Sequence, residues 1–121
     1  MSNTVFVKSG EQPRYFAFSG NLSTTSAVAS SPIYKDSPYS SFQAIVTGTG
    51  AVTATVVIQA TNEEATRLGT STNWINIGTI SLSGTTTATD GFTTIAPWRA
   101  MRANVTGVTG TSAAVSVIMG V

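Results

Sequence analysis

Hydrophobic and polar residues alternate most regularly along residues 52–61. The residues of one parity are all apolar: Val52, Ala54, Val56, Ile58 and Ala60. The other parity is mostly Thr and Gln. A period of two predicts a strand with one buried face and one wetter face. After a polar loop at 63–73, residues 74–83 are expected to return as a second strand, in which Gly78 marks a bulge or a close approach.

The same alternation predicts strands on both sides of this pair, at 42–47, 91–96, 98–106 and 112–121, with shorter ones at 4–7 and 15–18. Residues 48–50 predict a tight hairpin turn, 84–90 a Thr-rich loop and 107–110 another turn. The apolar parity of the last two long strands is expected to face inward: Met101, Ala103, Val105, Val115, Val117 and Met119. Seven or eight strands separated by turns are typical of an all-β fold, a two-sheet antiparallel β-sandwich of the jelly-roll type.

The chain divides into three parts within a single domain, since 121 residues suffice for one core. Residues 1–20 read as an N-terminal arm that docks on a neighbouring subunit or as edge strands of the same domain. Residues 21–40 are rich in Ser and Pro and predict an irregular connection with one short strand at most, at 27–29. Residues 41–121 form the β-sandwich body.

The amino-acid composition limits the possible classes of function more than any motif does. Only 9% of the residues are charged, against about a quarter in typical domains, and 36 are Ser or Thr. The net charge of +1 indicates no nucleic-acid partner, and the lack of a long apolar run indicates neither a membrane span nor a signal peptide. We therefore expect a soluble protein made inside the producing cell. A surface with so little charge is poorly protected against association, which favours a protein covered by its own copies or by a larger assembly over a Thr-rich monomer.

Candidate chemistry is sparse. The chain has no His and no Cys, and its acids are scattered, so we expect no enzyme activity, no catalytic residues, no cofactor and no metal site. Glu63 and Glu64 are adjacent in the sequence, but Asp90 stands in a different turn, so the three do not form a catalytic carboxylate pair. A calcium site that used Glu63 or Asp90 would lack the residue spacing of an EF-hand. Trp74 and Trp98 could stack on sugar rings, with the alternative that both indoles pack at the ends of the sandwich.

The pattern from residue 52 to residue 113 resembles small virion structural proteins of tailed bacteriophages. The segments that carry the resemblance are VTATVVIQATN at 52–62, Trp74 with IGTISLSG at 77–84, DGF at 90–92, PWRAMRANV at 97–105 and TGTSA at 109–113. Such proteins decorate or cement the capsid, or occur in related head and tail fittings, and commonly assemble as trimers. The resemblance implies a capsid decoration protein on the virion surface, made in the bacterial host cytoplasm. Its partners would be its own copies, as a homotrimer, and the major capsid protein.

The resemblance and the composition together suggest where such a protein would make its contacts. We expect capsid or subunit contacts from the apolar residues of the N-terminal part and of the following connection: Val5, Phe6, Val7, Tyr15, Phe16, Ile33, Tyr34 and Tyr39. The alternatives are a phage tail or head-fibre component, or a carbohydrate- or receptor-binding β-sandwich module. In the module, Trp74 and Trp98 would be the stacking residues.

Overall fold

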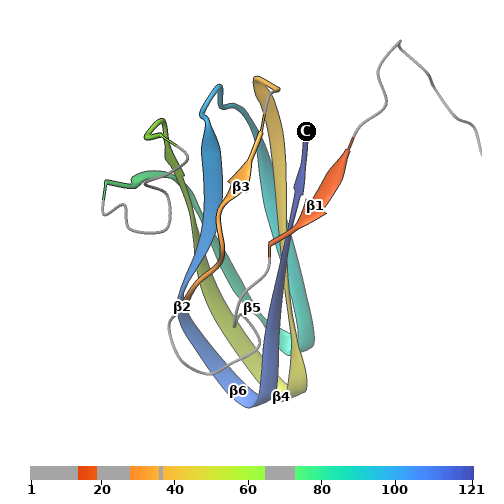
Figure 1. The fold of residues 1–121 in the computed structure, drawn as a ribbon. Coiled ribbons are helices and arrows are strands. Elements are labelled where there is room, and N and C mark those ends of the chain that lie inside the picture. Colours follow the sequence, from red (N-terminus) through yellow and green to blue (C-terminus); the bar gives the residue numbers. More distant parts are fainter. Residues whose placement is uncertain (1–13, 19–27, 36, 65–72) are drawn as a thin grey trace, which may run out of the picture.

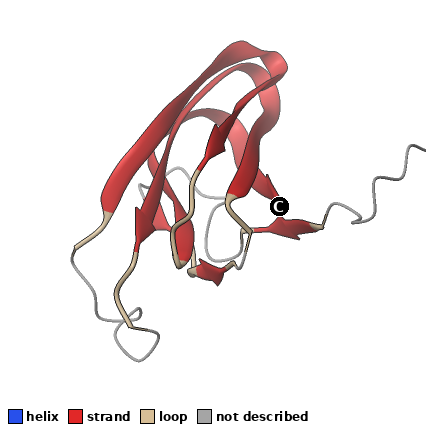
Figure 2. Cartoon of the chain, turned by 90° about the horizontal axis from the view of Figure 1, so that it is seen from above, coloured by secondary structure: helices blue, strands red, loops and turns tan. Residues whose placement is uncertain are grey.

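The computed structural model of this chain describes residues 14–18, 28–35, 37–64 and 73–121. These residues form an antiparallel β structure, and no helix covers the sheet in either view (Figures 1 and 2). The strands in chain order are β1 Tyr15–Ala17, β2 Val28–Ala29, β3 Ile33–Tyr34, β4 Tyr39–Thr61, β5 Ile75–Ile95 and β6 Ala100–Gly120. The all-β prediction is thus confirmed for the described residues.

Three long strands dominate the fold. β4 lies in the middle and pairs with β5 on one side and β6 on the other, both antiparallel. The far edge of β6 is covered by three short strands, β1 near its C-terminal end and β2 and β3 near its N-terminal end (Figure 1). The order β1-β6-β4-β5 therefore leaves β5 at the other edge of the sheet.

All three long strands bend at the same level of the sheet. The register shifts between Thr47 and Ala51 where β4 meets β5, and again where β4 meets β6. Positive φ angles occur in each strand at this level: Gly50 (73°), Thr86 (64°), Gly110 (128°) and Ser112 (55°). Glycine adopts such angles without steric penalty, whereas Thr and Ser do so rarely. Figure 1 shows the resulting corner at the lower end of the molecule, where each strand turns back into a second arm.

The two arms of the bent sheet enclose one hydrophobic core. Apolar residues of alternate positions on both sides of the corner are buried together, as the sequence pattern predicts. They include Phe42, Ala44, Val46, Val52, Ala54, Val56, Ile58, Ala60, Ile80, Leu82, Met101, Ala103, Val105, Val115, Val117 and Met119. The intervening Thr and Ser residues face outward; the hydroxyl groups of Thr53 and Thr109, for example, are hydrogen-bonded across β4 and β6.

Gly78 shows how closely the two arms approach one another. A Cβ atom added at Gly78 would lie 2.6 Å from Cζ of Phe92, which belongs to the opposite arm of β5. Phe92 cannot withdraw freely, because its ring packs on Phe42 with a centroid separation of 5.2 Å. The register of β5 against β4 also shifts beside Gly78, between Ile58 and Gln59. The prediction of a bulge or a close approach at this glycine is confirmed by the close approach to Phe92.

The predicted division into seven or eight strands is wrong for the described residues, which form six. Residues 48–50 do not make a hairpin, because the segments before and after them pair with β5 and β6 and not with each other. The predicted loop at 84–90 and the predicted turn at 107–110 are likewise parts of continuous strands that bend. Residues 33–34 form a strand that was not predicted, whereas the short strand near 27–29 is present as β2.

The connection before β4 is fixed to β6 by hydrogen bonds. The hydroxyl of Ser30 accepts a bond from the backbone N–H of Ala103 at 2.9 Å, and the Ser30 N–H donates to the Ala103 carbonyl at 2.7 Å. Further along, the Lys35 N–H donates to the carbonyl of Arg99 at 3.0 Å. This part of the predicted irregular connection thus covers the edge of β6 instead of running free over the surface. The predicted strand at 4–7 and most of the loop at 63–73 lie outside the described residues.

Gly78→Ala should destabilise the protein, because the new methyl group meets a ring that is itself held by Phe42. We expect the free energy of unfolding in urea to fall by about 1–3 kcal/mol, as for other overpacked cores. Gly107→Ala is the matched control, since a Cβ atom there has no neighbour within 4 Å and should change stability by about 0.5 kcal/mol at most. Equal effects of the two substitutions would contradict the close packing of the arms.

Candidate interaction surface

Titratable side chains do not gather into a reactive cluster in the described part of the chain. There, no group of three or more Asp, Glu, His or Cys side chains is placed to hold a metal ion. Glu63 and Glu64 follow the end of β4, whereas Asp90 lies within β5 and accepts a hydrogen bond from the N–H of Gly91 at 2.8 Å. Among the described residues, no helix has the length and apolar character needed to span a membrane. The notable surface features are instead two grooves with aromatic side chains, of which the larger has no charged side chain.

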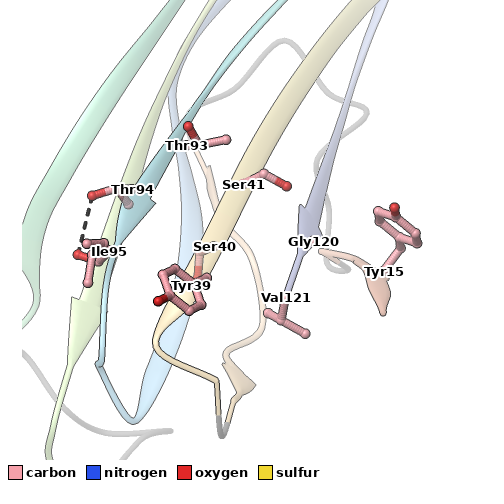
Figure 3. Close-up of a pocket in the computed structure, with 9 residues that line it drawn as sticks. All are labelled: Tyr15, Tyr39, Ser40, Ser41, Thr93, Thr94, Ile95, Gly120 and Val121. Carbon is pink, nitrogen blue, oxygen red and sulfur yellow. Dashed lines mark hydrogen bonds between the residues drawn. The ribbon is translucent and has the colours of Figure 1, made fainter. Parts of the chain in front are cut away.

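A groove of about 700 Å³ lies beside the last residues of β6, the first residues of β4 and the last residues of β5 (Figure 3). Cross-strand register places one residue from each of four strands in a single row: Tyr15, Gly120, Ser41 and Thr93. Tyr39 of β4 and Ile95 of β5 are also cross-strand partners, two residues from Ser41 and Thr93 toward the ends of these strands. None of the lining side chains is charged, so the groove offers aromatic rings, aliphatic groups and hydroxyls to a partner.

Gly120 gives the neighbouring side chains of this row room to pack. A Cβ atom at Gly120 would lie 2.6 Å from the hydroxyl oxygen of Ser41 and 3.3 Å from two ring carbons of Tyr15. The ring of Tyr15 therefore lies against the glycine backbone, an arrangement in which an aromatic neighbour covers a strand glycine. A side chain at position 120 would crowd the Ser41 hydroxyl and the Tyr15 ring, so that both would have to shift.

The apolar side chains at this end of the sheet are unusually exposed. Ile95 is 73% exposed, Tyr15 69% and Tyr39 65%. A second, smaller groove of about 260 Å³ meets the first at Val121 and is lined by Phe16 and Tyr34 together with Arg14 and Lys35. Single exposed apolar residues are ordinary, whereas a group of this kind marks an interaction site. We refer to Tyr15, Tyr39 and Ile95, which line the larger groove, as the aromatic surface; Phe16 and Tyr34 line the smaller groove.

The structure places four of the residues expected to make capsid or subunit contacts in two adjoining grooves, two residues in each. Tyr15 and Tyr39, which are 24 positions apart in the sequence numbering, line one groove, and Phe16 and Tyr34 line the other. Ile33 differs, because it is half-buried and packs against the core. Val5, Phe6 and Val7 lie outside the described residues. Sequence reasoning missed Ile95, which reads as a core residue because it ends an apolar strand before Pro97.

The two tryptophans occupy different environments. The guanidinium carbon of Arg102 lies 4.4 Å from the ring centroid of Trp74, a cation–π contact. Trp98 is half-buried and packs against the core, two residues before the start of β6. Its neighbours in a small hollow include Lys35, Pro38 and Asn62. This geometry favours packing roles for both indoles over a shared sugar-stacking platform.

Arg102 connects Trp74 to the outer face of the sheet. Its Nε donates a hydrogen bond of 2.7 Å to the side-chain oxygen of Gln59, whose own amide nitrogen donates to Asn76 at 2.9 Å. Burial lowers the pKa of the Arg102 guanidinium from its ordinary value. The group nevertheless stays protonated near neutral pH, because arginine titrates only under strongly basic conditions. The network therefore links the side chains of three neighbouring strands, β5, β4 and β6, and stabilises their packing.

Comparison with known proteins adds no relative. No protein-family model, no curated protein and no solved structure matches this chain. The phage resemblance in the sequence pattern therefore has no independent support from a related protein. A function has to be argued from the composition, the bent sheet and the aromatic surface.

Replacing Arg102 should weaken the fold without affecting the aromatic surface. Arg102→Met removes the cation–π contact with Trp74 and the charged hydrogen bond to Gln59. We expect a loss of about 1–2 kcal/mol in the free energy of unfolding, measured by urea denaturation, together with a shift in tryptophan emission. Arg99→Met, at an exposed position, should change stability by about 0.5 kcal/mol at most. The stabilising role of the Arg102 contacts is contradicted if both variants are as stable as the parent protein.

Proposed function

We propose that this chain is a capsid decoration, or cement, protein of a tailed bacteriophage. It would bind the outer surface of the shell as a homotrimer and stabilise the shell by bridging neighbouring copies of the major capsid protein. The observation that carries the proposal is the aromatic surface at one end of the sheet, because it gathers Tyr15, Tyr39 and Ile95 in an exposed and uncharged groove. The phage resemblance in the sequence pattern supplies the class of partner.

The bent sheet suits a mechanical function. In this proposal, the arms on the two sides of the corner correspond to the layers of a jelly-roll-like sandwich, and the enclosed core keeps them rigid. A rigid body can present the aromatic surface without losing much conformational entropy when it binds. The short strand β1 places Tyr15 and Phe16 beside the C-terminal end of β6, so that the surface is fixed to the body by backbone pairing.

A decoration protein of this kind would act through many modest contacts. A single contact of about 1,200–2,000 Å² is ordinary for a specific interface, and symmetric repetition over a shell raises the overall strength through multivalency. Because the groove has no charged lining side chain, its contacts should depend little on salt. The proposal therefore describes a virion surface protein that reinforces contacts between shell subunits.

Shell binding should depend on the aromatic surface and not on exposed apolar residues in general. We expect Tyr39→Ala and Ile95→Ala each to weaken binding to purified shells about tenfold or more, as central interface residues do. Ile75→Ala provides the matched control, since Ile75 is 51% exposed but lies at the other end of β5. Its binding should stay within about twofold of the parent protein.

Binding would be measured by co-sedimentation of the protein with shells lacking it, at two salt concentrations. Circular dichroism of each variant would establish that the fold is retained. The proposal fails if the parent protein does not sediment with any shell offered. The assignment to the aromatic surface fails if the variants at positions 39, 75 and 95 lose binding equally.

A further inference from the structure

The outer edge of β5 pairs with no strand in the described part of the chain. β5 is the last strand in the order β1-β6-β4-β5, and it contains 21 residues. Natural sheets usually protect such an edge with lysines, prolines or charges. Here Asp90 is the single charged residue between the two ends of the strand. An edge that is long, carries a single charge and is rich in backbone donors and acceptors is suited to receive another strand.

A row of apolar side chains ends at this edge. Met119, Phe42 and Phe92 are direct cross-strand neighbours on β6, β4 and β5. The first two are buried, with exposed fractions of 0% and 2%, whereas Phe92 is only half-buried. Phe92 stands in the last strand, so no further strand covers its outer side among the described residues. One more strand with an apolar residue at the next position would complete the row.

We propose that residues 4–7 of a second copy add to β5 as an antiparallel strand beside residues 91–94. The segment has the sequence Thr-Val-Phe-Val and is followed by Lys8. In the register that places Phe6 opposite Phe92, the row of Met119, Phe42 and Phe92 is extended by a further aromatic ring. The same register places Lys8 opposite Asp90, an oppositely charged pair of the kind that stabilises antiparallel strands. Val5 then lies beside Thr93, next to the exposed side chain of Ile95.

The arm of a neighbouring copy is a better occupant than the chain's own arm. Residues 1–13 join β1 at Arg14, and β1 lies at the opposite edge of the sheet from β5. Within one chain the arm would have to cross three strand spacings, about 14 Å, over the outer face before it could turn along β5. In a head-to-tail arrangement, the β1 edge of one copy faces the β5 edge of the next. The arm then meets its strand without crossing its own sheet.

A head-to-tail contact of this kind closes into a ring when the rotation between copies permits it. The inference deepens the proposed function, which includes self-association, and rests on it only in that respect. It assigns the self-contact to the arm and to the β5 edge and leaves Tyr15 and Tyr39 for the shell, whereas Thr93 and Ile95 lie where the two contacts meet. The test below uses no shell, so that failure of self-association and failure of shell binding are distinguishable.

Cysteine cross-linking tests the pairing directly, because the chain has no cysteine of its own. Val5→Cys and Thr93→Cys would be introduced into separate full-length chains that carry different tags and are co-expressed. Mild oxidation should join the two chains by a disulfide, since facing residues in antiparallel strands have suitable Cβ separations. Ser81→Cys, an exposed hydroxyl position in the other arm of β5, serves as the matched partner for Val5→Cys and should cross-link about tenfold less.

Three results would overturn the proposal. The first is equal cross-linking of Val5→Cys to positions 81 and 93. The second is a disulfide within single chains of the Val5→Cys/Thr93→Cys double variant, when the mixture of the two single variants forms no disulfide between chains. That result would place the arm on its own sheet. The third is a predominant Thr93→Cys homodimer, which would indicate pairing of β5 with β5.

Sedimentation of uncross-linked protein gives a second readout. Phe6→Asp should weaken self-association about tenfold or more, because a charge would stand beside Phe92, whereas Phe6→Leu should change it by about threefold at most. A Phe6→Asp variant that assembles as tightly as the parent protein would also contradict the pairing.

Discussion

Packing of the two arms of one bent sheet against each other is the interaction on which this structure depends. A single flat layer of three long strands would leave its apolar face in water, and the described residues contain no helix to cover it. The corner solves this by folding the layer over, so that Phe92 from one arm meets Gly78 from the other. Burial of apolar area is the dominant favourable term in folding, and here it requires the bend.

The bend also determines which edges of the sheet remain available. β6 has its outer edge covered by β1, β2 and β3, and Ser30, which follows β2, adds a backbone hydrogen bond to Ala103. β5 has no such cover in the described part of the chain. Since strand edges are natural sites for pairing with other chains, one side of the sheet is closed and the other is open. This asymmetry is what makes a head-to-tail contact geometrically simple.

Much of the fold follows from local sequence, and the rest depends on contacts between distant residues. Alternation assigned the inward faces correctly, because the period of two is a property of the strand itself. The corner was misread as a hairpin because glycines at 48 and 50 permit either structure. Which one forms depends on whether 42–47 pairs with 52–61 or with β5 and β6, and that choice is not local. In the sequence, Tyr15 and Tyr39 stand out as aromatic residues that follow polar segments, whereas Ile95 resembles a core residue, so its exposure depends on the fold.

The chemistry of the aromatic surface limits the way in which it could bind. Long-range electrostatic steering needs charge, and none of the side chains that line the larger groove is charged. The association rate with a partner should therefore lack electrostatic enhancement. The affinity would depend on how completely the partner buries Tyr15, Tyr39 and Ile95. Such a surface is effective where the partner is present at high local concentration or in many copies, because multivalency then replaces steering. A repeating shell satisfies that condition, whereas a dilute soluble partner does not.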